Sequence, residues 1–127
     1  MSSLRTLLPA LICAAILPIQ AAGRDQIAEI IANCTGRMSA QMEFAWLRSD
    51  PESDRLEKQR HRFVEILEAV GHSADRRAQM ALRINAKMAH ARLLSLAHFG
   101  SQSTSRARAK RQAALHLSAC QNMLLDS

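Results

Sequence analysis

Apolar residues recur at every third or fourth position along most of this chain, which is the spacing of helices that bury one face. The clearest run falls between residues 25 and 48, and its apolar face consists of Ile27, Ile31, Cys34, Met38, Met42 and Ala45. No segment alternates apolar and polar residues as a half-buried strand would. The pattern predicts an all-α fold in which this segment is the first and central helix of a small antiparallel bundle.

Capping residues and helix breakers divide the chain into four predicted helices. Their approximate limits are residues 25–48, 51–70, 74–99 and 104–125. The signals are N-caps at Asp25, Asp50 and Ser73, a first helical position at Pro51, helix ends before Gly71 and Gly100, and a serine-rich loop at 101–105. Periodicity assigns inward faces to the last three helices, respectively Leu56, Phe63, Leu67 and Val70; Ala81, Ile84, Met88 and Ala91; and Ala109, Ala113, Leu117, Cys120 and Leu124.

The first 21 residues have the pattern of a secretory signal peptide. Arg5 is their only charge, residues 7–17 form an apolar run, and Ala21 offers a small residue for cleavage. An uncleaved membrane anchor is the alternative, but the apolar run is shorter than the roughly 20 residues that span a bilayer. We expect cleavage to leave residues 22–127 as a single helical domain, periplasmic or secreted.

Export would remove Cys13 and leave Cys34 and Cys120 in an oxidising compartment, which favours a disulfide. In an up-down-up-down bundle the start of the first helix and the end of the fourth share one end, so the two thiols fall at similar depths. A three-helix arrangement would hold them apart. The cysteines therefore predict both a Cys34–Cys120 bridge and the number of helices. No Cys-x-x-Cys pair points to metal ligation.

Charge is divided unevenly along the sequence. Residues 24–75 have a net charge of −3, whereas residues 76–127 have a net charge of +8. A helix dipole disfavours cations at the helix start, yet the fourth helix begins with Arg106, Arg108, Lys110 and Arg111. We predict that the basic face of the third and fourth helices binds an acidic protein or an anionic envelope surface; the alternative is a face that is only solvated. Export argues against nucleic acid as the partner.

The methionines support a second functional hypothesis. Thioethers are ligands of Cu(I), and Met38 and Met42 lie one helical turn apart, so a periplasmic copper-binding protein with Met and His ligands is an alternative. Ordinary packing in the core is the competing interpretation of the same residues, because flexible methionines fill irregular cores.

The end of the first helix carries three large apolar residues, Phe44, Trp46 and Leu47, which point in three directions around the helix. We expect the bundle to surround this helix end. The alternative leaves Trp46 or Phe44 free for a partner, or for a second copy in a purely structural homo-oligomer. Earlier in the same helix, Gly36 either admits another backbone at close range or marks a kink.

No spacing of nucleophiles, bases or metal ligands indicates an enzyme. The five histidines form no His-x-x-x-His or Glu-x-x-His pair, and no glycine-rich loop is present to hold a phosphate. We expect no catalytic activity and no cofactor, and we expect the histidines to lie exposed on helix surfaces.

The stretch from Cys34 to Leu47, CTGRMSAQMEFAWL, resembles a pattern in uncharacterised small exported helical proteins of Gram-negative bacteria. The resemblance covers about 14 residues. It implies export and brings no particular activity with it.

Overall fold

The computed structural model describes residues 19–71 and 76–125, and these residues form four helices and no strand. The helices are α1 (Ile19–Leu47), α2 (Ser53–Val70), α3 (Arg76–Phe99) and α4 (Ser103–Leu125). The prediction of an all-α four-helix bundle is confirmed. Residues 1–18 of the predicted signal sequence and the predicted N-cap Ser73 lie outside the described residues.

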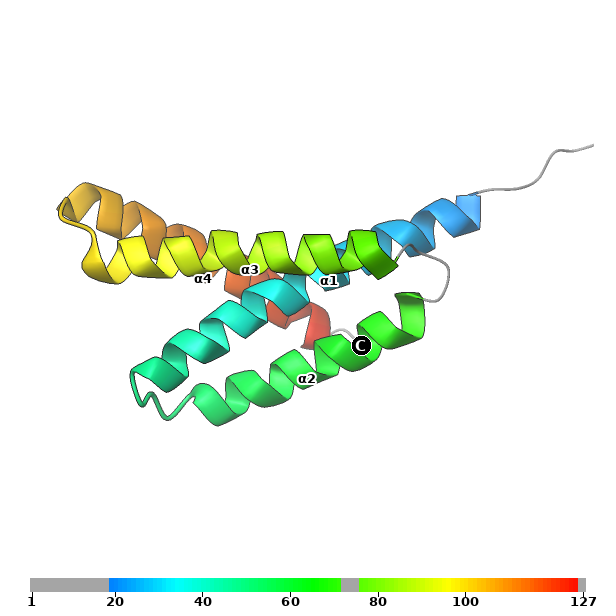
Figure 1. The fold of residues 1–127 in the computed structure, drawn as a ribbon, viewed down its shortest axis with the longest axis horizontal. Helices are drawn as coiled ribbons and strands as arrows, with labels where there is room; N and C mark the ends of the chain where they lie inside the picture. Colours follow the sequence, from blue (N-terminus) through cyan, green and yellow to red (C-terminus); the bar gives the residue numbers. More distant parts are fainter. Residues whose placement is uncertain (1–18, 72–75, 126–127) are drawn as a thin grey trace, which may run out of the picture.

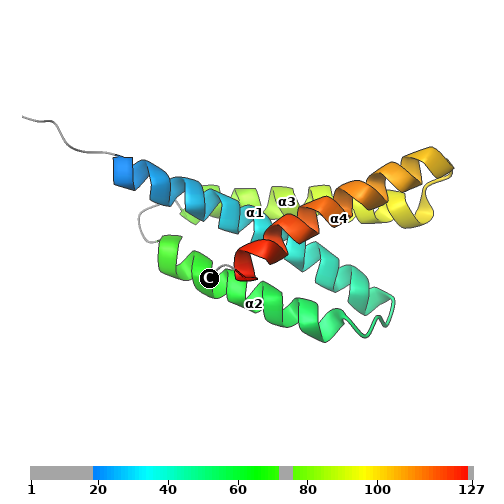
Figure 2. The same cartoon turned by 180° about the vertical axis from the view of Figure 1, so that it is seen from behind.

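Consecutive helices run in opposite directions and form two helical hairpins, α1–α2 and α3–α4 (Figure 1). The hairpins cross near their middle, and their two turns point in different directions (Figure 1). Helix α1 is central, because it packs most extensively on α3, then on α2, and also touches α4. Figure 2 shows the crossing from behind, with α4 returning along α3 toward the middle of the molecule.

The core lies where the two hairpins cross. Its main cluster combines residues of α1, α2 and α4, namely Ile31, Ala32, Cys34, Met38, Phe63, Leu67 and Cys120. The predicted Cys34–Cys120 disulfide is present inside this cluster, with the two Cα atoms 5.5 Å apart. A second cluster, Met42, Ala45 and Leu56, packs α1 against α2 closer to their turn. The bridge therefore fastens the end of α4 to the middle of the central helix.

Gly36 marks a place where the backbones of α1 and α3 approach closely. A Cβ atom at this position would collide with the backbone carbonyl oxygen of Arg83 and would lie 2.9 Å from the backbone nitrogen of Lys87. The Cβ atom of Ala86 would be only 3.0 Å away. Of the two interpretations of Gly36, close approach of a neighbouring backbone is the one that the structure supports.

Substituting alanine for Gly36 is expected to lower the free energy of unfolding by about 2 kcal/mol, because overpacking at backbone contacts costs roughly 1–3 kcal/mol and outweighs the gain in helix propensity. The matched control is Gly23→Ala in the same helix, where a Cβ atom would meet nothing within 4 Å. That variant should gain up to about 1 kcal/mol. Urea denaturation followed by circular dichroism measures both; equal effects of the two substitutions would contradict the close crossing.

Two of the predicted helix starts are wrong. Helix α1 begins at Ile19, so Asp25 lies inside the helix and is not its N-cap. Asp50 precedes α2 but caps the turn before it, since its Oδ1 accepts a hydrogen bond of 2.9 Å from the backbone N–H of Glu52. The turn itself begins at Ser49, whose φ of 52° is left-handed, and the N–H of Asp50 donates to the carbonyl of Ala45 at 2.9 Å. This is the Schellman arrangement with serine in the usual position of glycine.

The inward face of α3 also differs from the predicted one. The structure buries Gln79, Ala86, His90 and Leu94. Ala81, Ile84 and Met88, which periodicity assigns to the core, are exposed, and Ala91 is half-buried. The close crossing at Gly36 explains the difference, because it requires a small residue such as Ala86 on the face of α3 that meets α1. In α4 the prediction holds: Ala109, Ala113 and Cys120 are buried.

Candidate functional site

The four cations predicted to bind a partner form a collar around the first turns of α4. Successive helical residues turn by 100°, so Arg106, Arg108, Lys110 and Arg111 point to different sides of the helix. All four are exposed. Among the described residues, none of the four forms an ion pair. We call these four residues the basic collar; they lie on the exposed sides of the first turns of α4, after the turn that joins α3 to α4.

Helix α3 adds to the positive charge of this hairpin and brings no acidic residue. Its cations are Arg76, Arg77, Arg83, Lys87 and Arg92. Lys87 is engaged with the acidic half of the chain, since its Nζ lies 2.6 Å from Oε1 of Glu43 on α1. Arg92 lies exposed on the outer side of the helix. The α3–α4 hairpin is therefore a uniformly basic arm joined to a bundle half of opposite net charge.

The second group of predicted site residues, at the end of α1, is only partly surrounded by the bundle. Phe44 is half-buried against the ring of His98 on α3, with centroids 4.7 Å apart, and the guanidinium of Arg48 lies 5.5 Å from the Phe44 centroid. Trp46 and Leu47 remain 49% and 85% exposed. The expectation that neighbouring helices surround this helix end is wrong, because the turn of the α1–α2 hairpin points away from the turn of the α3–α4 hairpin (Figure 1).

His98 connects the two predicted groups of residues. The Nη1 atom of Arg48 lies 3.3 Å from its Nδ1. Partial desolvation lowers the pKa of His98, and the positive charges of Arg48 and Lys110 lower it further. Lys110 of the basic collar thus acts on the same imidazole that packs on Phe44. The structure brings the end of α1 and Lys110 of the collar close to the same residue of α3.

The methionines of the copper hypothesis are packed in the core. Met38 is fully buried in the main cluster, and Met42 is 5% exposed in the second cluster beside Leu56. Residues 19–71 and 76–125 contain no group of three or more His, Cys, Asp or Glu side chains that would hold a metal ion. Packing therefore accounts for both thioethers, and the copper hypothesis stays a prediction with no feature of the described core to support it.

His90 is a buried histidine that the sequence does not reveal. It is 1% exposed, and its Nε2 lies 2.9 Å from Oε1 of Gln41 on α1. Its Nδ1 is buried without a hydrogen-bond partner. Desolvation lowers the pKa of His90 to about 4, with smaller contributions from His116 on α4 and Arg37 on α1. The expectation that the histidines lie exposed is wrong for His90, which is held neutral between three helices.

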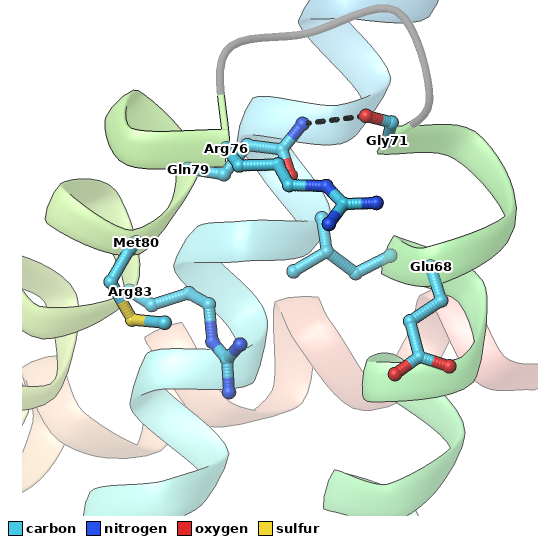
Figure 3. A pocket seen from close by; sticks show the side chains of 7 residues that line it. Glu68, Gly71, Arg76, Gln79, Met80 and Arg83 are labelled. Carbon is cyan, nitrogen blue, oxygen red and sulfur yellow. Dashed lines mark hydrogen bonds between the residues drawn. The ribbon is translucent and has the colours of Figure 1, made fainter.

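A pocket of about 340 Å³ opens where the end of α2 faces the start of α3 (Figure 3). The α3 wall includes the guanidinium groups of Arg76 and Arg83, and the opposite wall includes the carboxylate of Glu68 (Figure 3). Gln79 lies buried between them and donates from Nε2 to the carbonyl of Gly71 at 3.5 Å. Sequence reasoning missed this site, because its residues meet only through the connection of α2 to α3. Two guanidiniums give it the chemistry to hold a small anion.

Within the described ranges, no helix has the length and apolar character required to cross a membrane. Comparison with known proteins found no match: no family model, no curated protein and no solved structure matches the chain. The resemblance of the Cys34–Leu47 stretch to small exported proteins therefore stays a prediction.

Proposed function

We propose that this protein is exported and works without catalysis, as a binding protein whose basic α3–α4 hairpin attaches to an acidic protein or an anionic envelope component. The observation that supports this most is the charge of the hairpin. Between Arg76 and Leu125 the chain has nine lysine and arginine residues and no acidic residue. The residues of the basic collar are exposed, so their charges are available to a partner.

The fold supports the same proposal. The disulfide and the Gly36 crossing fasten the hairpin to α1, while the collar projects from the part of α4 that lies near the hairpin turn. A rigid arm of one charge would speed encounter with a partner of opposite charge and orient it. Export is consistent with the disulfide, since such bridges persist in oxidising compartments.

The proposal predicts that removing the collar charges weakens binding without unfolding the protein. In the variant R106Q/R108Q/K110Q/R111Q, each substitution is exposed and should change stability by under about 0.5 kcal/mol. Four lost charge interactions of about 0.5 kcal/mol each correspond to roughly thirtyfold weaker binding. The measurement is chemical crosslinking in the envelope of the native cell, capture, and determination of affinity for the captured partner at several salt concentrations.

The matched control removes four positive charges from the other half of the molecule. R24Q/R55Q/K58Q/R62Q changes the net charge equally, and all four positions are exposed. The control should bind almost as wild type does. If the collar variant captured the same partners with unchanged affinity and an unchanged salt dependence, the basic collar would be only a solvated surface.

A further inference from the structure

The outer side of α3 exposes a continuous row of large apolar residues. Met80, Ile84 and Met88 are four residues apart, and each is about half exposed, at 50%, 53% and 52%. The same row continues through Arg92 to Leu96, and Phe99 lies at its end beside the hairpin turn. We call the five apolar residues Met80, Ile84, Met88, Leu96 and Phe99 the outer stripe. Residues four apart are offset by about 40° around the helix axis, so the stripe winds across the outer half of α3.

Large apolar residues are also exposed on α1 and α4, but α3 has more of them than any other described helix; those outside α3 are Ile27, Ile30, Trp46, Leu47, Leu115 and Leu125. Helix α2 has a solvent-facing side on which no large apolar residue is exposed. Its exposed positions carry both signs of charge, for example Lys58 and Glu65. Helix α3 instead combines exposed apolar side chains with cations alone. Contiguous apolar surface of this kind marks a contact with something other than water.

The charges on α3 restrict what covers the stripe. Arg92 lies within the stripe. A symmetric contact between two copies would bring Arg92 and the nearby collar cations toward their equivalents in the other copy, and like charges across an interface are unfavourable. The partner must accept apolar side chains and positive charges from the same side. An anionic lipid surface does so, because phosphate groups overlie an apolar interior.

The shape of the stripe also fits a lipid surface better than a folded protein. A convex helical ridge needs a complementary groove on a protein partner, whereas a fluid interface adapts to it. From Ile84 to Phe99 the stripe is about 22 Å long at 1.5 Å per residue, long enough to lie along a bilayer surface. Met80, at the start of the stripe, lines the pocket that faces the end of α2, so a flat surface would approach the part of the stripe from Ile84 to Phe99.

We propose that α3 lies on an anionic lipid surface, with the outer stripe at the boundary between headgroups and acyl chains and with Arg92 and the collar cations on the same side of the molecule bound to lipid phosphates. This inference rests on the proposed function and names its partner class. It assigns the exposed apolar residues to insertion and the cations to the initial attraction, since burial of apolar area and electrostatic attraction together determine the strength of interfacial binding.

The test is sedimentation of the exported protein with vesicles of phosphatidylcholine and phosphatidylglycerol at a 3:1 ratio or of phosphatidylcholine alone. Wild type is expected to bind the anionic vesicles and to bind them less as salt rises. The variant I84Q/M88Q/F99Q should bind more than about tenfold more weakly, because it removes apolar side chains that would enter the interface. The control L47Q/L115Q also replaces exposed leucines, at 85% and 67%, but outside the stripe, and should bind as wild type does.

Insertion of the outer stripe into the lipid surface can be measured separately, by tryptophan fluorescence. With Trp46 replaced by phenylalanine, a tryptophan introduced at Phe99 should shift its emission to shorter wavelength on addition of the anionic vesicles. A tryptophan introduced at Leu115 in the same background should not shift. Equal behaviour of the two reporters would overturn insertion of the stripe.

The remaining outcomes separate this inference from the proposed function. Absence of wild-type binding to anionic vesicles overturns the lipid inference, while capture of an acidic protein that is lost in the collar variant would leave the proposed function in place. If the variant I84Q/M88Q/F99Q binds the anionic vesicles as tightly as wild type does, the inference is also overturned, because the charges alone would then account for the binding. A wild-type dimer that I84Q/M88Q/F99Q converts to monomer would show that a second copy covers the stripe, and would overturn it as well.

Discussion

Replacing both Cys34 and Cys120 by alanine is expected to lower the free energy of unfolding by about 4–5 kcal/mol. The bridge joins residues 86 positions apart, and closing so long a loop restricts the unfolded chain by about that amount on the chain-entropy estimate. Both cysteines are buried, so alanine avoids placing a polar group in the core. Small domains are stable by roughly 5–15 kcal/mol in total, which makes this the largest single contribution that we can assign.

Urea denaturation of the oxidised wild type and of C34A/C120A measures this effect directly. The single variant C34A should lose nearly as much as the double variant, because either substitution removes the same cross-link. A loss below about 1 kcal/mol in the double variant would mean that the bridge constrains the unfolded chain little and that packing alone holds α4 on α1.

Acidification from pH 7.5 to pH 4.5 is expected to destabilise the protein through His90. The neutral imidazole is favoured in the fold, where burial lowers the pKa of His90 from 6.5 to about 4. The stability that neutral, buried His90 contributes is therefore fully present above pH 6.5, and it is lost as the pH falls from 6.5 toward 4. At about 1.4 kcal/mol per pH unit, this window corresponds to a loss of roughly 3 kcal/mol.

The groups that face His90 work in the same direction. Arg37 on α1 and His116 on α4 oppose a positive charge at His90, and Gln41 satisfies only its Nε2. The variant H90Q should lose most of this pH dependence, whatever its stability at neutral pH. The control H61Q replaces an exposed histidine that pairs with Glu65 on the surface of α2 and should keep it. Parallel stability profiles for wild type and H90Q between pH 7.5 and 4.5 would contradict the account.

The sequence predicts the number of helices, the ends of α2, α3 and α4, and the disulfide, because these depend on local signals. Gly71 and Gly100 follow helix ends, and the positions of Cys34 and Cys120 match only when four helices alternate in direction. The exposure of the basic collar is predictable for a similar reason, since unpaired charges rarely enter a core.

The orientation of α3 is not predictable from periodicity. This helix has apolar residues on more than one side. The side that carries Ile84 and Met88 is the more apolar one, so periodicity assigns it to the core. The backbone approach at Gly36 instead favours the side of Ala86, and hydrogen bonding to Gln41 brings His90 inward. Both effects depend on residues of α1 that are more than forty positions away in the sequence. The outer stripe is the consequence, and it became visible only with the tertiary structure.

The pocket between α2 and α3 escaped prediction for the same physical reason. Glu68 and Arg83 belong to separate helices, and only the reversal of the chain after Gly71 brings them to opposite walls. The exposed end of α1 depends on the angle at which the hairpins cross, which local signals do not specify.

The central claim is that the α3–α4 hairpin makes the contact with the partner. Its most direct test is site-specific photocrosslinking in living cells, with the reactive residue placed at Ser95 on α3, at Gln112 on α4 or at Glu57 on α2. All three positions are exposed, and none of them is a cation. Crosslinks to an envelope protein or lipid are expected from Ser95 and Gln112, and none are expected from Glu57. Crosslinks from Glu57 alone would place the contact on the other hairpin and contradict the central claim.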